Sequence, residues 1–478
     1  MILLIFGRAM QYLLALVMMR VATTLLSPEQ VGVVAIVSAS VGFFAMFFVN
    51  PVGMFINRRL LVWHLSGVAQ NYLIRFAGYL LLVAITAGMF LTLLSLSSIM
   101  DFTVSIAWLV ILVCGSLFFN TISQTTLSSL NFLGYRGQFI LLSVSTISAS
   151  LVCAVLLVKM EHPSAEWWLF GLLLGQVLFA IIGIRVLFSH LQDQATISKS
   201  GQITKRHWQS LLSFAWPVAI AAGLAWVQGQ GYRYIMESQL GLAQLGLFVA
   251  GYGISAGMIS GFESVLTTYF QPRLYRDANS DHPVRQAQAW QRYAAAVIPS
   301  LLLTGALIVM LAPELTRIFL GERFQSASDY VIWGALAESA RVLMGIYSMI
   351  AHVHMQTRWL IVPNVIGATL AIALSALLIP HLGAAGVGMG LAISGFAVVA
   401  TMHILLARWV GGGIPMHPVM MAGGAAMALW WMTLCLRYML NAVSPWGRIV
   451  GVLVLVGMAY MGLQFLFLRQ HLTEKSEA

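Results

Sequence analysis

A few charged side chains interrupt stretches of sequence that are otherwise almost entirely apolar. Arg20, Arg233, Glu263, Glu338 and Arg341 each lie inside an apolar segment as long as a membrane-spanning helix, which is about 20 residues. A charge at the bilayer centre costs about 2.5–3.5 kcal/mol on insertion scales, so each of these charges requires a partner or a function. The arginines suit an anion, because the planar guanidinium fork binds two phosphate oxygens at once.

Uncharged amides accompany these charges in the same segments, and they are Asn50, Gln228 and Gln230. Gln230, Arg233, Tyr234 and Glu237 follow i, i+3, i+4, i+7 spacing, which places them on one face of a helix. A polar face on a membrane helix contacts protein or water rather than lipid. We therefore expect a water-filled chamber between two halves of the protein, with Arg20, Arg233 and Arg341 as anion ligands and the amides as its polar walls.

Each of these residues also has a purely structural interpretation. Arg233 can pair with Glu237 or extend to the outer membrane interface, and Arg20 can extend outward in the same way. Glu338 and Arg341 are three residues apart, so they can neutralise each other. Glu263 and Glu338 are candidates for ion coupling, and a protonated or paired structural carboxyl is the alternative.

Composition limits the elements that can position these residues. The chain has 478 residues, of which 60% are apolar and 8% charged, with a mean hydropathy of +0.89. These values exclude an ordinary soluble protein and leave no room for a separate soluble domain. Apolar stretches predict an all-α polytopic membrane protein with fourteen spans, at residues 2–26, 31–56, 70–97, 104–132, 137–159, 167–189, 209–236, 244–270, 288–312, 329–355, 359–380, 386–408, 416–438 and 446–468.

The distribution of basic residues predicts the orientation of these spans. With the N-terminus in the cytoplasm, most arginines and lysines fall in cytoplasmic loops, including the basic segments near 190–208 and 271–287. The topology therefore has fourteen spans with both termini cytoplasmic. The net charge of +10 follows from this loop bias, so it requires no nucleic-acid partner.

The sequence predicts no catalytic, metal or cofactor site. Cys114, Cys153 and Cys435 lie in apolar runs without a metal-ligand spacing. There is no P-loop, so ATP hydrolysis by this chain is not expected to drive transport. We predict that the protein is not an enzyme.

Positions in the first half recur in the second half at a nearly constant offset. Arg20, Gly32 and Arg58 correspond in this way to Arg233, Gly246 and Arg273. Such an offset is typical of a parallel repeat whose halves are related by an axis along the membrane normal. We predict a six-helix lobe at 1–190, a cytoplasmic linker at 191–208, a second six-helix lobe at 209–410, and two additional helices with a cytoplasmic tail at 411–478.

One segment resembles the hallmark of a transporter family. The run from Leu378 to Ser394, LIPHLGAAGVGMGLAIS, is similar to the motif with which the oligosaccharide flippases enter their twelfth span. Residues 25–32, 245–252 with 272–274, and 313–324 resemble other segments of that family. The resemblance covers residues 8–410 and points to the Wzx-like branch of the multidrug/oligosaccharidyl-lipid/polysaccharide exporter superfamily.

This resemblance implies a function as well as a fold. It implies two six-helix lobes that translocate a polyprenyl-pyrophosphate-linked oligosaccharide by alternating access across the bacterial inner membrane. The cargo would be an O-antigen, exopolysaccharide or capsule repeat unit. The intramembrane arginines would meet its pyrophosphate, and membrane lipids, a polymerase and other glycan-assembly proteins would be partners. A peptidoglycan lipid-precursor flippase, a drug or cation antiporter, and a membrane glycan polymerase are the alternatives.

Overall fold

The structure is a computed structural model that describes residues 2–97, 104–192, 205–278, 283–354, 356–410 and 416–473. Within these residues the backbone is helical and contains no strand. The predicted linker at 191–208 falls mostly outside the described residues, as do the boundary near 411 and the end of the tail. The chain forms two compact units, Met1–Gly246 and Leu247–Ala478. The prediction of lobes that meet at a linker after residue 190 remains a prediction.

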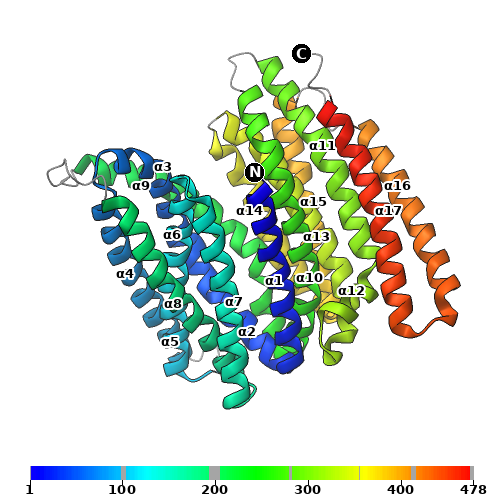
Figure 1. Cartoon of the computed structure of the whole chain (residues 1–478), viewed down its shortest axis with the longest axis horizontal. Helices are drawn as coiled ribbons and strands as arrows, with labels where there is room; N and C mark the ends of the chain where they lie inside the picture. Colours follow the sequence, from blue (N-terminus) through cyan, green and yellow to red (C-terminus); the bar gives the residue numbers. More distant parts are fainter. Residues whose placement is uncertain are drawn as a thin grey trace. The chain divides into compact units, whose positions relative to one another are not determined.

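The first unit contains the following helices, which Figure 1 shows from blue to green: α1 (Ile2–Leu25), α2 (Pro28–Phe44), α3 (Asn50–Leu65), α4 (Ala69–Leu96), α5 (Ile106–Gly115), α6 (Thr121–Phe132), α7 (Arg136–Met160), α8 (Ala165–Gln192), α9 (Lys205–Gln230) and the start of α10 (Tyr232–Asp277). Ser27 accepts a hydrogen bond from the Gln30 amide and Pro28 opens α2, which explains the sharp turn between α1 and α2. Gly241 has a φ of 81°, and this left-handed residue separates the seventh span from the eighth.

Two π-helical turns interrupt spans of the first unit. The turn η1 (Ala45–Val49) joins α2 to α3, and the turn η2 (Ser116–Asn120) joins α5 to α6. Pro51 lies two residues after the end of η1 and has no amide hydrogen to donate, so the hydrogen-bond ladder of the second span is irregular there. The Phe48 carbonyl in this turn accepts a hydrogen bond from the Tyr79 hydroxyl at 2.9 Å. The π turn thus exposes a backbone acceptor that a neighbouring helix satisfies.

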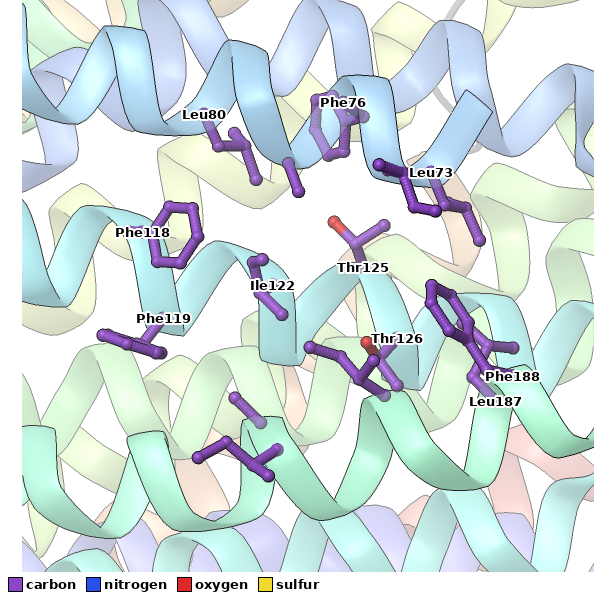
Figure 2. Close-up of a pocket in the computed structure, with 15 residues that line it drawn as sticks. Leu73, Phe76, Leu80, Phe118, Phe119, Ile122, Thr125, Thr126, Leu187 and Phe188 are labelled. Carbon is purple, nitrogen blue, oxygen red and sulfur yellow. The ribbon is translucent and has the colours of Figure 1, made fainter. Parts of the chain in front are cut away.

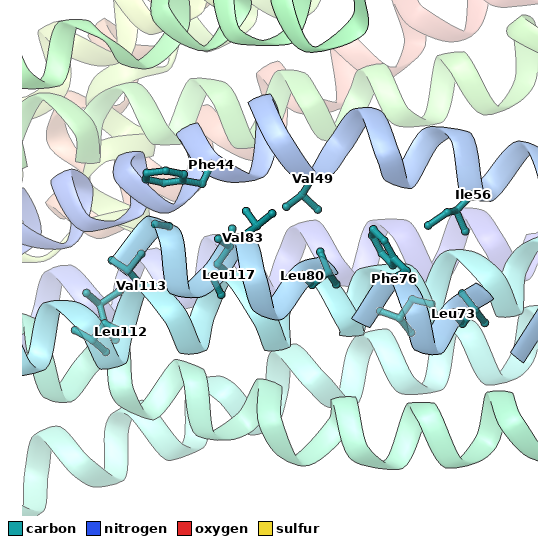
Figure 3. Packing of buried hydrophobic residues seen from close by; sticks show 14 of the residues in the cluster. Phe44, Val49, Ile56, Leu73, Phe76, Leu80, Val83, Leu112, Val113 and Leu117 are labelled. Carbon is teal, nitrogen blue, oxygen red and sulfur yellow. The ribbon is translucent and has the colours of Figure 1, made fainter. Parts of the chain in front are cut away.

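The core of the first unit is a continuous apolar cluster between these helices. Figure 3 shows side chains of α2, α3, α4, α5 and the turn η2 meeting there, among them Phe44, Val83 and Leu117. The helices α7 and α8 pack closely, because Gly171 and Gly175 lie against the backbone of Ala154 and Ser150. Small residues let membrane helices approach each other when hydrophobic attraction between helices is weak.

The second unit contains the remainder of α10 together with the following elements: α11 (Pro283–Met310), α12 (Ala312–Phe319), η3 (Glu322–Ala327), α13 (Ser328–Val353), η4 (Thr357–Leu360), α14 (Ile361–Leu382), α15 (Ala384–Val410), α16 (Met416–Met439), η5 (Leu440–Ala442) and α17 (Pro445–Thr473). The additional helices α16 and α17 both pack against α11 (Figure 1). Gly383, with a φ of 58°, ends α14 and allows the turn into α15 inside the segment that resembles the flippase motif.

Polar contacts fix the two additional helices to the second unit. Arg437 of α16 donates to both carboxylate oxygens of Glu314, at 2.9 and 2.7 Å, and to the Met310 carbonyl at 2.7 Å. On α17, the Tyr460 hydroxyl lies 2.7 Å from Thr304 Oγ1 and accepts a hydrogen bond from the Gln464 amide.

The observed helices confirm the predicted membrane architecture. Eleven segments of the described chain are long and apolar enough to cross a membrane, and one of them, at 211–277, contains both the seventh and eighth predicted spans. The first and tenth predicted spans correspond to α1 and α13, which are helical over comparable lengths. Every one of the fourteen predicted spans therefore coincides with a helix, and the protein is a multi-pass membrane protein.

Candidate functional site

The predicted site residues occupy two clusters and several separate positions. The first cluster surrounds Arg233, where α9 and the start of α10 cross α2 in the first unit. Nη1 of Arg233 donates to the Ala35 carbonyl at 2.9 Å, and the Trp226 ring nitrogen donates to the Ala39 carbonyl at 3.2 Å. The Tyr234 hydroxyl lies 2.9 Å from Ser40 Oγ. Three neighbouring side chains of the seventh span are thus held by one face of α2.

Glycines allow this crossing. A Cβ atom at Gly32 would overlap the carbonyl of Leu242, and a Cβ atom at Gly246 would overlap the carbonyl of Pro28. Gly32 and Gly246 are the same residues that mark the internal repeat in the sequence. In the structure Gly32 of α2 contacts the backbone of α10, and Gly246 of α10 contacts the backbone of α2. These two positions of the repeat therefore serve the packing of α2 against α10.

Arg233 is anchored but not fully satisfied. Its Nε atom is buried and has no hydrogen-bond partner among the described residues, and its guanidinium carbon lies 6.0 Å from the centre of the Tyr232 ring. A buried donor without an acceptor costs about 1–3 kcal/mol. An anionic oxygen at this position would remove that cost.

Arg20 lies on the exposed side of α1. Met18, Ala22 and Leu25 form the face of α1 that packs against the core around Leu26 and Ala154. Helix positions two apart point to different sides, so Arg20 points away from that core, and it is half-buried. Its carbonyl accepts hydrogen bonds from Thr23 at 3.2 Å and from Thr24 at 2.7 Å.

The predicted polar walls are dispersed along the first unit. Gln228 is buried near the end of α9, Gln230 is half-buried at the end of that helix, and Asn50 is exposed at the first position of α3. Asn50 directly follows the π turn η1, and π turns in membrane and soluble helices are frequent at functional sites.

The second cluster joins α10 to α13 in the second unit and unites three predicted residues. Arg341 donates from Nε to Glu338 at 2.6 Å and from Nη2 to Glu263 at 2.9 Å. Nη2 also donates to Ser260 at 3.2 Å, and the Tyr252 hydroxyl donates to Glu338 at 2.7 Å. The pair of Glu338 and Arg341 that their spacing predicted is therefore formed, and Glu263 is added from another helix.

Burial differs among the charged groups of this cluster. The side chain of Glu338 is 8% exposed, that of Glu263 is 23% exposed and that of Arg341 is 44% exposed. Two carboxylates face one guanidinium, so the fully ionised cluster has a net charge of −1. A group of this charge, partly open to its surroundings, can accept one proton or one monovalent cation.

Sequence reasoning missed Tyr252 and Ser260 as members of the cluster. Both lie on the same helix face as Glu263, because separations of eleven and three residues are close to whole numbers of helical turns. This helical periodicity in the sequence could have indicated that both residues lie near Glu263. The α2 partners of Arg233 and Trp226 left no such signal, because both are backbone carbonyls.

Two apolar pockets of the first unit lie near these elements. The smaller pocket has a volume of about 290 Å³ and lies between α4, α6 and α8. Its polar groups are Thr125 and Thr126 of α6, which Figure 2 shows beside leucine and phenylalanine side chains. A larger groove of about 550 Å³ lies between α3, α4 and α9 and includes Arg75. Neither pocket contains the predicted anion ligands.

The arrangement of helices is similar to that of solved flippase and transporter structures. A lipid II flippase MurJ in an inward closed conformation superposes with a TM-score of 0.68 over 98% of this chain and 99% of that one, at 15% identity. An inward-facing multidrug resistance MATE family transporter of the MOP superfamily gives a TM-score of 0.54 over 85% of this chain and 94% of that one, at 14% identity. The chain shares the helical fold of these two structures.

A eukaryotic MATE transporter, AtDTX14, extends this similarity. It gives a TM-score of 0.53 over 89% of this chain and 96% of that one, at 14% identity. No family model and no curated protein matches the sequence. The solved structures named here are a lipid II flippase and MATE transporters.

Proposed function

We propose that this protein is a flippase for a glycan linked to a polyprenyl pyrophosphate, which it moves across the bacterial inner membrane by alternating access. The observation that carries the proposal is the similarity to a lipid II flippase along 98% of the chain. The MATE transporter structure covers 85% of the chain at a lower TM-score. The sequence segment at residues 378–394 supports a Wzx-like cargo, namely an O-antigen, exopolysaccharide or capsule repeat unit.

Arg20 and Arg233 are the proposed ligands of the pyrophosphate. A pyrophosphate must leave water to cross the membrane, and charge-assisted hydrogen bonds from guanidinium groups replace part of its hydration. The unpartnered, buried Nε of Arg233 supports this role, because it is a donor already removed from water. Gln228, Gln230 and Asn50 would contact the sugar, which can remain hydrated.

The cluster of Glu263, Glu338 and Arg341 is the proposed coupling site. A proton or monovalent cation on Glu263 would weaken its bond to Arg341 and leave that guanidinium available for the anionic cargo. Glu263 is the better candidate of the two carboxylates for this exchange, since it is the more exposed. Arg341 would then bind Glu263 in the absence of the ion and the anionic cargo in its presence, which would link ion binding to cargo binding.

The peptidoglycan lipid-precursor alternative is favoured by one specific observation, which is the lipid II flippase among the structural neighbours. One experiment distinguishes the two cargoes. The protein is depleted from cells, and the lipid-linked glycans of the cytoplasmic leaflet are extracted and identified by mass spectrometry. Accumulation of a polysaccharide repeat unit supports the proposed cargo, and accumulation of the peptidoglycan precursor supports the alternative. Unchanged levels of both would reject a flippase function.

The arginine ligands have their own test. Arg20→Ala and Arg233→Ala should abolish complementation of the depleted strain, whereas Arg→Lys at either position should retain part of it, because lysine keeps the charge and loses the bidentate fork. Arg185→Gln, an exposed charge on α8, is the matched control. Full complementation by the alanine variants at normal membrane abundance would show that the arginines are only structural.

A further inference from the structure

We infer that the groove between α3, α4 and α9 binds one anionic phospholipid, whose acyl chain occupies the groove and whose phosphate lies against Arg59 and Arg75. The site is separate from the proposed cargo ligands, since none of Arg20, Arg233 and Arg341 lines the groove. The inference therefore does not depend on the identity of the cargo.

The groove itself has the composition of a hydrocarbon site. Aromatic rings dominate its lining, and they include Phe48, Phe55, Phe76 and Trp216. The Tyr79 hydroxyl also lines it but already donates to the Phe48 carbonyl, so this polar pair is satisfied without water. An alkyl chain can enter such a groove without desolvating this pair.

The size of the groove favours one acyl chain over a long prenyl chain. Its volume is about 550 Å³. A cavity of about 150 Å³ accommodates one benzene ring, so a groove several times larger has room for about twenty carbon atoms. That is the length of a single acyl chain, whereas a polyprenyl carrier is considerably longer.

Two arginines at the groove provide the complementary charge. The guanidinium carbon of Arg75 lies 6.0 Å from the centre of the Tyr72 ring, and that of Arg59 lies 5.9 Å from the centre of the Phe55 ring. Both rings line the groove, and both arginines are exposed. Neither arginine forms an ion pair within the described part of the chain.

The predicted orientation of the protein agrees with this chemistry. Arg59 on α3 and Arg75 on α4 lie on either side of the turn at 66–68, which the distribution of basic residues places in the cytoplasm. The cytoplasmic leaflet contains anionic lipids that attract basic residues near the membrane surface. The occupant is therefore an anionic phospholipid of that leaflet.

Native mass spectrometry of the full-length protein, released from nanodiscs that contain phosphatidylglycerol and phosphatidylcholine, tests the inference. The wild type should retain one phosphatidylglycerol in preference to phosphatidylcholine. Arg59→Gln and Arg75→Gln should each weaken retention about fivefold, which corresponds to the contribution of one arginine near an anionic surface. Arg185→Gln removes an equal charge outside the groove and should retain the lipid as the wild type does.

A second variant tests the acyl chain independently of charge. Ala219→Phe places a ring into the groove and should also reduce the retained lipid, while the thermal unfolding temperature in detergent shows that the variant is folded. Equal retention by the double variant Arg59→Gln/Arg75→Gln would overturn the inference. Equal retention of phosphatidylcholine, or preferential retention of an added polyprenyl phosphate, would overturn it as well.

Discussion

Replacing Arg341 by methionine should destabilise the second unit more than any replacement of its carboxylate partners by an isosteric amide. The substitution leaves Glu338, whose side chain is only 8% exposed, without its cationic partner. It also leaves Glu263 with a second carboxylate nearby. Methionine keeps much of the length of the side chain, so packing changes little and the effect measures the lost charge.

The expected magnitude follows from burial. Breaking a fully buried ion pair from one side costs about 3–5 kcal/mol. The Arg341 side chain is 44% exposed, so water screens part of the interaction, and we expect about 2–3 kcal/mol. For a unit of this size, each kcal/mol lowers the unfolding temperature by about 2–4 °C. Arg341→Met should therefore unfold about 5–10 °C below the wild type.

A double-mutant cycle tests whether the loss is electrostatic. Glu338→Gln alone should have a smaller effect, because the amide oxygen can still accept a hydrogen bond from the Tyr252 hydroxyl. The double variant Glu338→Gln/Arg341→Met removes the buried uncompensated charge and should be more stable than Arg341→Met alone by about 1–2 kcal/mol. Thermal unfolding of the purified protein in detergent, monitored by intrinsic fluorescence, measures each value. An unfolding temperature of Arg341→Met equal to that of the wild type would show that the ion pairs do not stabilise the unit. A double variant no more stable than Arg341→Met would show that the loss is not electrostatic.

Two further predictions concern packing and buried hydrogen bonds. Gly32→Ala should destabilise the first unit by about 1–3 kcal/mol, because the added Cβ would overlap the Leu242 carbonyl. Gly53→Ala is the control and should be neutral or slightly stabilising, because a Cβ there has no atom within 4 Å. Unfolding curves that coincide for the two variants would contradict this prediction. Tyr460→Phe should lower the free energy of unfolding by about 1–3 kcal/mol, because the buried Gln464 amide and Thr304 hydroxyl each lose a hydrogen-bond partner. Tyr438→Phe, at an exposed position, is the control in the same unfolding assay.

The sequence by itself determined the helices and their membrane character. Most spans have enough consecutive apolar residues to cross a bilayer, and this property is local, so every predicted span coincides with helical structure. The rarity of charges inside spans is also local. It singled out Glu263, Glu338 and Arg341, which the structure then unites in one cluster.

Only the tertiary structure decided which groups these residues contact. Glu338 and Arg341 are three residues apart, so helical geometry alone pairs them, but Glu263 comes from another helix and no spacing in the sequence specifies that contact. Arg233 shows the same limit more strongly, because its partner is the backbone carbonyl of Ala35. Every residue has a carbonyl, so a backbone acceptor carries no mark in the sequence, and the crossing of two helices selects which one is used.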